Sequence, residues 1–209
     1  MTDLFARRLV KSYNYSPYED IQILCPSKKG VLGVTELNEK LQNAVNPHTD
    51  DKKEIKFGRK ILRVGDKVMQ YKNNYDILYT RDNGEQGSGI FNGDIGIIED
   101  IQKKDQRIKI RFDDKTAVYD FDSAQDIELS YATTIHKSQG NEFTAVIIPL
   151  FNTPPMLCYR DLLYTGVTRA KKLLIMVGDK NIISKMTFSN KRNGRYCGLK
   201  YLLLKDNII

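Results

Sequence analysis

Residues 131–142 read Tyr-Ala-Thr-Thr-Ile-His-Lys-Ser-Gln-Gly-Asn-Glu, and a second block, residues 164–170, reads Tyr-Thr-Gly-Val-Thr-Arg-Ala. Each block places hydroxylated side chains, a cation and a glycine between apolar runs. This composition suits phosphate binding at the edge of a sheet, because the polar groups donate hydrogen bonds and glycine lets the main chain approach closely. No G-x-x-x-x-G-K-[ST] loop, the usual triphosphate-binding motif, occurs in the chain. The two blocks therefore predict that this chain carries only half of a phosphate-binding site.

The segments around these blocks predict strands and helices in alternation, the order of a doubly wound α/β sheet. Leu37, Leu41 and Val45 recur at helical spacing, with Thr35 as the expected N-cap and Asn46-Pro47 as the stop. Apolar runs without alternation predict buried strands at 21–25, 145–148 and 173–177. Helices are expected at 4–13, 133–138, 160–170, 180–188 and 198–205, with a basic loop at 191–195.

Between residues 50 and 125 the chain changes to short β-rich runs separated by turn residues, which predicts a small barrel. Strands are expected at 67–71, 95–98, 107–112 and 117–121, and the polar stretch 73–89 is expected to be a disordered tip. The predicted organisation is an α/β domain in two parts, 1–49 and 126–209, with the barrel inserted between them.

Composition limits the partners that the chain is expected to have. It has 33 Lys+Arg against 26 Asp+Glu, a net charge of +7 and a pI near 9.2, which favours nucleic acid before membrane. Three scattered cysteines and two histidines predict neither a zinc cluster nor a disulfide framework, so no metal site is expected. No apolar run approaches the roughly 20 residues of a membrane helix. A cytoplasmic protein with no membrane partner is therefore expected.

The block around His136 has a functional and an ordinary interpretation. Hydroxyls, imidazole, ammonium and amide within seven residues can present several donors to a phosphodiester backbone. A lone histidine, however, is more often structural, a Lys-Ser pair is usually solvated surface, and an arginine such as Arg169 usually forms a surface salt bridge. Residue chemistry alone leaves these alternatives open.

Taken together, the motifs resemble superfamily I helicases of the RecD type, that is, the α subunit of exodeoxyribonuclease V and its stand-alone relatives. Residues 132–147 resemble motif V of that family, residues 163–171 resemble motif VI, and residues 24–33 are similar to the motif IV region. Residues 65–70, 73–76 and 91–96 resemble an SH3-like barrel inserted in the second motor domain. The resemblance implies a RecA-like (P-loop NTPase type) second motor domain carrying that barrel.

The same resemblance implies roles for individual residues. Arg169 matches the arginine finger that reaches the γ-phosphate, and Gln139, Gly140 and Glu142 match the nucleotide-facing end of motif V. Thr133, Thr134, His136, Lys137 and Ser138 match its DNA-facing end. The full protein is expected to use ATP and magnesium, held mainly by an N-terminal motor domain absent from this chain, to move 5′-to-3′ on single-stranded DNA. Nuclease or helicase subunits are possible partners in DNA repair or recombination.

Some features depart from the family or point elsewhere. Lys28 and Lys29 stand where the family commonly has an arginine, so solvated lysines are expected there. The aromatic residues Tyr71, Tyr75, Tyr79 and Phe91 are expected to be mostly core. The chain alone is expected to be catalytically inert. The alternatives are a non-catalytic nucleic-acid- or protein-binding module and the helicase part of a conjugative relaxase.

Overall fold

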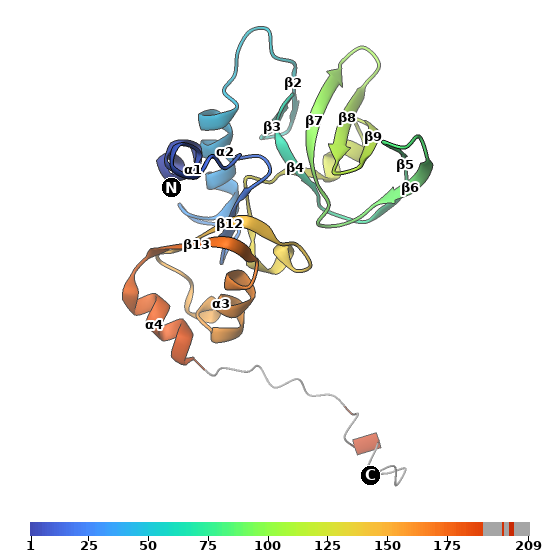
Figure 1. Cartoon of the computed structure of the whole chain (residues 1–209). Coiled ribbons are helices and arrows are strands. Elements are labelled where there is room, and N and C mark those ends of the chain that lie inside the picture. The colour runs from blue at the N-terminus through green and yellow to red at the C-terminus, as the bar shows by residue number, and fades with distance from the viewer. Residues whose placement is uncertain (190–197, 199–200, 203–209) are drawn as a thin grey trace.

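The computed structural model describes residues 1–189, 198 and 201–202. Its first layer is a four-stranded parallel sheet in the order β11-β1-β12-β13. Figure 1 shows two of these strands, β12 and β13, side by side. The bounds are Ile21–Cys25 for β1, Ala132–Thr134 for β11, Phe143–Leu150 for β12 and Ala170–Gly178 for β13. Since β1 lies between β11 and β12, a strand from the start of the chain is paired on both sides by strands that follow the β-rich segment. The predicted parallel α/β sheet is confirmed.

Helices cover both faces of this sheet because successive strand residues point to opposite sides. On one face, Ile21, Ile23 and Ile147 pack with the helical segment formed by η1 (Leu4–Arg8) and α1 (Leu9–Tyr13), and with α2 (Val34–Val45). On the other face, Val146 and Ile148 pack with α3 (Arg160–Val167) and α4 (Lys180–Phe188). Burial on both faces explains why these strands read as uninterrupted apolar runs.

The second layer is a seven-stranded antiparallel sheet in the order β10-β4-β7-β8-β9-β5-β6. Its bounds are Lys67–Gln70 for β4, Asn74–Arg81 for β5, Gln86–Ile90 for β6, Ile95–Gln102 for β7, Arg107–Phe112 for β8, Lys115–Asp120 for β9 and Ile127–Leu129 for β10. A separate hairpin pairs β2 (Glu54–Phe57) with β3 (Lys60–Arg63). In β8 the exposed Lys109 and Arg111 alternate with buried apolar residues, as predicted.

One prediction about this second sheet was wrong. Residues 73–89 do not form a disordered tip, because they make up most of the β5–β6 hairpin, in which Tyr79 pairs with Gly87. A Cβ atom at Gly87 would lie 2.5 Å from the Tyr79 hydroxyl oxygen, so the missing side chain makes room for the ring. Ile77 and Ile90 anchor the hairpin in the core. The glycine-rich composition reflects close packing as well as turn formation.

Several boundaries also differ from the predictions. The N-cap of α2 is Gly33, because the Thr35 hydroxyl donates instead to the Lys28 carbonyl at 3.4 Å. The predicted helix 133–138 starts as strand β11 and continues as the 3-10 helix η3 (Ile135–Ser138). The predicted helix 160–170 ends at Val167, from which the chain passes into β13. The predictions for 191–195 and 198–205 lie outside the described residues, apart from the isolated positions in the latter.

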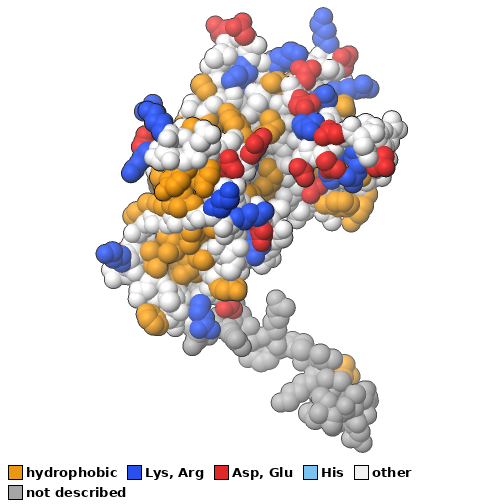
Figure 2. All heavy atoms as spheres, viewed as in Figure 1, with side chains coloured by type: hydrophobic (Ala, Val, Ile, Leu, Met, Phe, Trp, Pro, Cys, Tyr) orange, Lys and Arg blue, Asp and Glu red, His pale blue; other side chains and the backbone are white. Residues whose placement is uncertain are grey.

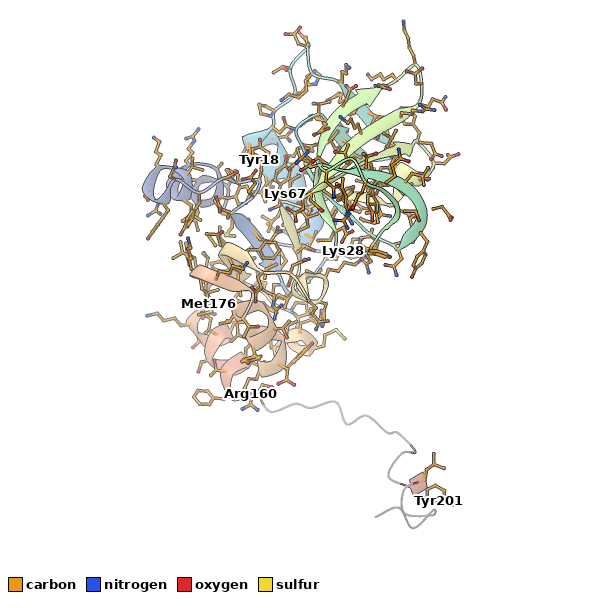
Figure 3. All side chains as sticks on the ribbon, turned by 45° about the vertical axis from the view of Figure 1, so that its right-hand side comes forward. Tyr18, Lys28, Lys67, Arg160, Met176 and Tyr201 are labelled. Carbon is orange, nitrogen blue, oxygen red and sulfur yellow. The ribbon has the colours of Figure 1, made fainter. Side chains whose placement is uncertain are left out.

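The two sheets are joined by buried polar residues at the start of β4. The Asp66 carboxylate accepts hydrogen bonds from the side chains of Gln42 at 2.5 Å, Asn46 at 2.7 Å and Tyr131 at 2.9 Å, and burial raises its pKa. The neighbouring Lys67 donates to the Ile21 carbonyl at 3.1 Å and lies where the sheets meet (Figure 3). These contacts fix the barrel to both α2 and the parallel sheet.

The surface varies between the two layers. Figure 2 shows Lys, Arg, Asp and Glu side chains intermixed over the barrel, while apolar side chains gather around the parallel sheet. In the part of the chain that the structure describes, no helix is both long and apolar enough to span a membrane.

Candidate functional site

The two sequence blocks meet at one edge of the parallel sheet. The turn 139–142 leads into β12, and Arg169 comes directly before β13. Since β12 and β13 are parallel neighbours with Phe143 opposite Ala170, the residues that precede them lie side by side. The Phe143 amide donates to the Arg169 carbonyl at 2.8 Å, which fixes this approach. The sheet therefore unites two segments that are separated in sequence.

Arg169 is half-buried at this edge, and neutral oxygens hold its guanidinium. Its Nε donates to the Thr165 carbonyl at 3.1 Å, one terminal nitrogen donates to the Asn141 carbonyl at 3.2 Å, and the other donates to Thr168 Oγ1 at 3.2 Å. Within the described ranges no carboxylate lies within ion-pair distance of it. The ordinary interpretation as a surface salt bridge is thus not what the structure shows. The positive charge stays uncompensated beside the turn 139–142.

The turn 139–142 is open to solvent. Gln139, Gly140 and Glu142 are exposed, and Gly140 adopts a φ of 91° with no heavy atom within 4 Å of where a Cβ would be. That backbone conformation favours glycine and leaves the main chain accessible. The Glu142 carboxylate lies 3.7 Å from the ammonium of Lys171, and both side chains are exposed, so this pair is weak. The geometry permits a ligand to contact the turn directly.

The residues predicted to contact DNA separate into accessible and buried positions. Thr134 caps η3 by accepting from the Lys137 amide at 3.3 Å, and His136 is exposed with its Nε2 3.2 Å from the Tyr159 hydroxyl. Thr133 is buried. Ser138 is also buried, and its hydroxyl donates to the Ile135 carbonyl at 2.8 Å. The side chains of Thr133 and Ser138 are therefore not accessible in this structure, and Ser138 closes the last turn of η3; their contact with DNA stays a prediction.

Lys137 reaches across to the barrel. Its ammonium donates to the Asn92 side-chain oxygen at 2.8 Å and to the Tyr71 carbonyl at 3.0 Å. It also lies 3.3 Å from the centroid of the Tyr71 ring, which Lys28 approaches at 4.8 Å. Partial burial and the charge of Lys28 lower the pKa of Lys137 against the opposing influence of Tyr71. Two of its three donors are therefore occupied within the protein.

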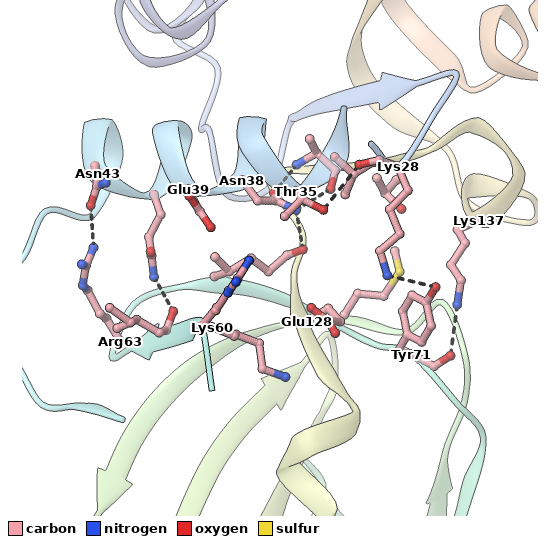
Figure 4. Close-up of a pocket in the computed structure, with 18 residues that line it drawn as sticks. Lys28, Thr35, Asn38, Glu39, Asn43, Lys60, Arg63, Tyr71, Glu128 and Lys137 are labelled. Carbon is pink, nitrogen blue, oxygen red and sulfur yellow. Dashed lines mark hydrogen bonds between the residues drawn. The ribbon is translucent and has the colours of Figure 1, made fainter. Parts of the chain in front are cut away.

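A cavity of about 370 Å³ separates α2 from β3 and the strand β10 (Figure 4). Its lining includes Lys28 and Lys137, which flank the Tyr71 ring, a third cation, Lys60, and the carboxylates Glu39 and Glu128. The pKa of Lys60 is lowered by burial, against the influence of Glu128. Lys60 and Glu128 belong to short strands with no motif, so their sequence context does not mark them as site residues. Only the fold brings them to the same cavity as Lys137.

The aromatic residues of the barrel differ from the prediction that they are mostly core. Tyr75 is 65% exposed and Phe91 is 43% exposed, and their rings pack edge to face with centroids 5.7 Å apart. Tyr71 and Tyr79 are half-buried. Barrel strands have only one buried face, so aromatic residues on the other face remain at the surface.

Metal ligands do not cluster in the described part of the chain, where no group of three or more His, Cys, Asp or Glu side chains could hold an ion.

Comparison with known proteins finds two family models, each matching part of the chain. Residues 37–112 match the family model described as the SH3 domain of ATP-dependent RecD-like DNA helicases. Residues 129–177 match the UvrD-like helicase C-terminal domain. The first model thus covers strands β2 to β8, and the second covers the sheet edge that carries Arg169.

Among curated proteins, the chain is similar to the RecD subunit of the RecBCD enzyme of Buchnera aphidicola (subsp. Schizaphis graminum). The two are 28% identical over 192 residues, which cover 90% of this chain and 30% of that protein. The ATP-dependent RecD2 DNA helicase of Deinococcus radiodurans is 31% identical over 158 residues, covering 76% of this chain and 20% of that protein. The chain therefore spans less than a third of the length of these relatives.

Among solved structures, the chain is similar to Pif1 from Bacteroides. The crystal structure bound to single-stranded DNA superposes with a TM-score of 0.50 at 18% identity, over 99% of this chain and 50% of that one. The complex with ADP-AlF3 and single-stranded DNA gives a TM-score of 0.51 at 20% identity, over 98% and 48%. At this identity the likeness establishes the fold.

Proposed function

We propose, from the premise that this chain is the C-terminal region of a RecD-like superfamily I helicase, that it supplies the arginine finger and part of the single-strand contacts of an ATP-dependent DNA helicase. The chain forms one wall of a composite nucleotide site. A second RecA-like motor domain, N-terminal to it, holds ATP and magnesium on the other wall. By itself this chain does not turn over ATP.

The placement of Arg169 carries this proposal. Its guanidinium lies beside the open turn 139–142 and has hydrogen bonds only to neutral oxygens in the described structure. A guanidinium held in this way is available to an anion that arrives from outside, because its charge is not neutralised and its planar fork matches phosphate oxygens. Such a group stabilises charge that develops during phosphoryl transfer. Gln139, Gly140 and Glu142 complete the nucleotide-facing edge.

The proposed DNA contacts are assigned to side chains that solvent can reach. Thr134 and His136 are accessible and lie on the segment that leads to the nucleotide-facing turn. Lys137, whose ammonium the barrel already engages, keeps one free donor. Because such contacts address the sugar-phosphate backbone, binding should be independent of sequence and weaken strongly with salt. One short segment then touches both ligands.

The division at residues 50 and 125, 5′-to-3′ movement, a cytoplasmic location and a place in repair or recombination complexes extend this proposal. The polarity and the place in repair or recombination derive from the resemblance to RecD-type proteins, whereas the division and the location derive from sequence pattern and composition.

The test is ATP turnover by this chain mixed with the N-terminal motor half, with single-stranded DNA present. We expect turnover from the mixture, none from the chain alone, and a loss of about 10³-fold for Arg169→Ala in the mixture. Arg160→Ala is the matched control, because Arg160 is an exposed arginine at the start of α3, the helix that precedes Arg169 (Figure 3). It should leave turnover unchanged.

Unimpaired turnover by Arg169→Ala would refute the arginine finger. DNA binding without any turnover from the mixture would favour the alternative of a non-catalytic binding module.

A further inference from the structure

We propose that Asn141 is a positioning residue, which ties the Arg169 guanidinium to the barrel turn formed by Asn92, Gly93 and Asp94. This inference rests on the proposed function. It adds a route by which the position of the barrel determines whether the arginine is correctly placed for catalysis.

Asn141 makes contacts in two directions. Its main-chain carbonyl accepts from a terminal nitrogen of Arg169 at 3.2 Å. Its side-chain Nδ2 donates to the Gly93 carbonyl at 3.2 Å. Its amide closes the preceding turn by donating to the Ser138 carbonyl at 3.1 Å. A single residue therefore links the guanidinium to the barrel through two successive hydrogen bonds.

The barrel turn is a firm support for this link. The Gly93 amide donates to the Gln70 carbonyl at 2.9 Å, and the Gln70 amide donates to the Asp94 carbonyl at 2.9 Å. Across the turn, the Phe91 amide donates to the Asp94 carboxylate at 3.0 Å. The turn is thus attached to β4 and moves with it. Gly93 has a φ of 101°, a conformation that favours glycine.

A second contact reaches the same turn from the other end of the segment. Lys137 donates to the Asn92 side-chain oxygen at 2.8 Å and to the Tyr71 carbonyl at 3.0 Å. Lys137 and Asn141 therefore hold the segment between them against adjacent residues of the barrel. Of the residues in between, Ser138 is buried, with its hydroxyl bonded to the Ile135 carbonyl, whereas Gln139 and Gly140 are exposed. Among the described residues the Gln139 side chain makes no hydrogen bond, so Lys137 and Asn141 hold the exposed part of the segment against the barrel.

The consequence is that movement of the barrel is transmitted to the Arg169 guanidinium. The turn 139–142 is an exposed loop, and Arg169 donates one of its three hydrogen bonds to it. A shift of the barrel relative to the parallel sheet would move Gly93, then Asn141, and then the guanidinium. Displacements of about 1 Å in a catalytic group can cost about 100-fold in rate. The barrel is thereby coupled to turnover without contacting the nucleotide.

Asn141→Asp tests the link with little change in shape, because it replaces the Nδ2 donor with an acceptor facing the Gly93 carbonyl. Asn181→Asp is the matched control: Asn181 is exposed at the start of α4, and its side chain makes no hydrogen bond to the described residues. In the mixture with the N-terminal motor half, we expect Asn141→Asp to lower kcat about 10- to 100-fold. The KM for ATP and the affinity for single-stranded DNA should change less than about 2-fold, and Asn181→Asp should change none of these.

A double variant separates positioning from general support of the fold. If Asn141 acts through the arginine, Asn141→Asp should cause no further loss of kcat in an Arg169→Ala background. In this chain alone, hydrogen exchange of residues 91–97 and 139–143 should accelerate in Asn141→Asp and not in Asn181→Asp, which reports the loss of the contact itself.

The outcomes are distinguishable. Turnover by Asn141→Asp equal to that of Asn181→Asp, alongside impaired Arg169→Ala, would overturn this inference and leave the proposed function intact. A loss of kcat that multiplies with that of Arg169→Ala would also overturn it, since the residue would then act independently of the arginine. Normal turnover by Arg169→Ala would overturn both proposals.

Discussion

The stability of this chain should rise with pH above neutrality because of one buried lysine. Lys67, the first residue of β4, is only 1% exposed, and its ammonium donates to the Ile21 carbonyl at 3.1 Å. Burial lowers the pKa of Lys67 from 10.5 to about 7, and the nearby carboxylates of Asp20 and Glu19 only partly oppose this. An unfolded chain would not share this burial, so the two states bind different numbers of protons.

The sign follows from proton binding. Between pH 7 and 10.5 the unfolded state keeps the proton on Lys67 while the folded state has released it, so the free energy of unfolding increases with pH. The slope is at most about 1.4 kcal/mol per pH unit, and the whole window contributes at most about 5 kcal/mol. Below pH 7 the folded state bears the full cost of the buried charge. Burial raises the pKa values of Tyr119 and Tyr131, which acts in the opposite direction above about pH 10.

The assay is urea unfolding followed by circular dichroism at pH 7, 8 and 9, with Lys67→Met as the perturbation. Methionine keeps most of the apolar stem but removes the ammonium, so the rise in stability between pH 7 and 9 should be smaller in the variant by roughly 1 kcal/mol per pH unit. The lost hydrogen bond to Ile21 shifts all three values by about 0.5–1.5 kcal/mol without affecting the slope. Lys40→Met, an exposed lysine on α2, is the control.

Equal slopes for the wild-type chain and Lys67→Met would refute the reasoning, because they would show that the folded and unfolded states titrate this lysine alike. A slope lost in Lys40→Met as well would show that general charge, and not burial, produces the effect.

Three further predictions concern the junction, the sheet and the nucleic-acid contacts. Asp66→Ala should lower the free energy of unfolding by about 3 kcal/mol or more, measured by urea titration, because several buried donors lose their acceptor. A change below about 1 kcal/mol would contradict the role of this carboxylate. Gly178→Ala should destabilise the sheet, since its Cβ would lie 2.3 Å from the Leu150 carbonyl oxygen, and an unchanged melting temperature would count against that packing. Thr134→Ala and His136→Ala should weaken single-stranded DNA binding about equally for all sequences in fluorescence anisotropy, whereas a marked sequence preference would contradict backbone contact.

The sequence was sufficient for the parallel sheet because its central strands β1 and β12 are buried on both faces and read as continuous apolar runs. The run 173–177 also lies within a strand, β13, but at the edge of the sheet, where its residues are only half-buried or exposed. The β5–β6 hairpin was not predicted because glycine occurs both in flexible turns and in strands where another side chain packs closely. The local sequence favours the flexible turn, and only the pairing of the two strands shows that Gly87 lies against the Tyr79 ring.

The candidate site was likewise predictable from the sequence only in part. The family resemblance implied that Arg169 and residues 139, 140 and 142 face one nucleotide, and the parallel pairing of β12 with β13 places them at one edge of the sheet. The side-chain environments could not be read from the motif. Ser138 and Lys137 are adjacent in sequence, yet Ser138 turns into the core and Lys137 reaches the barrel.

What the sequence by itself determined is chemical identity and order: which segments alternate as strand and helix, and which polar residues follow them. Only the tertiary structure decided how exposed each side chain is and which groups it contacts. Examples are the burial of Lys67, the cations around Tyr71 and the link from Gly93 through Asn141 to Arg169. The physical reason is the distance along the chain over which each kind of interaction acts. Periodicity and turn chemistry act over a few residues, whereas burial and hydrogen-bond partners depend on segments that lie tens of residues apart along the chain and meet only when the two sheets pack.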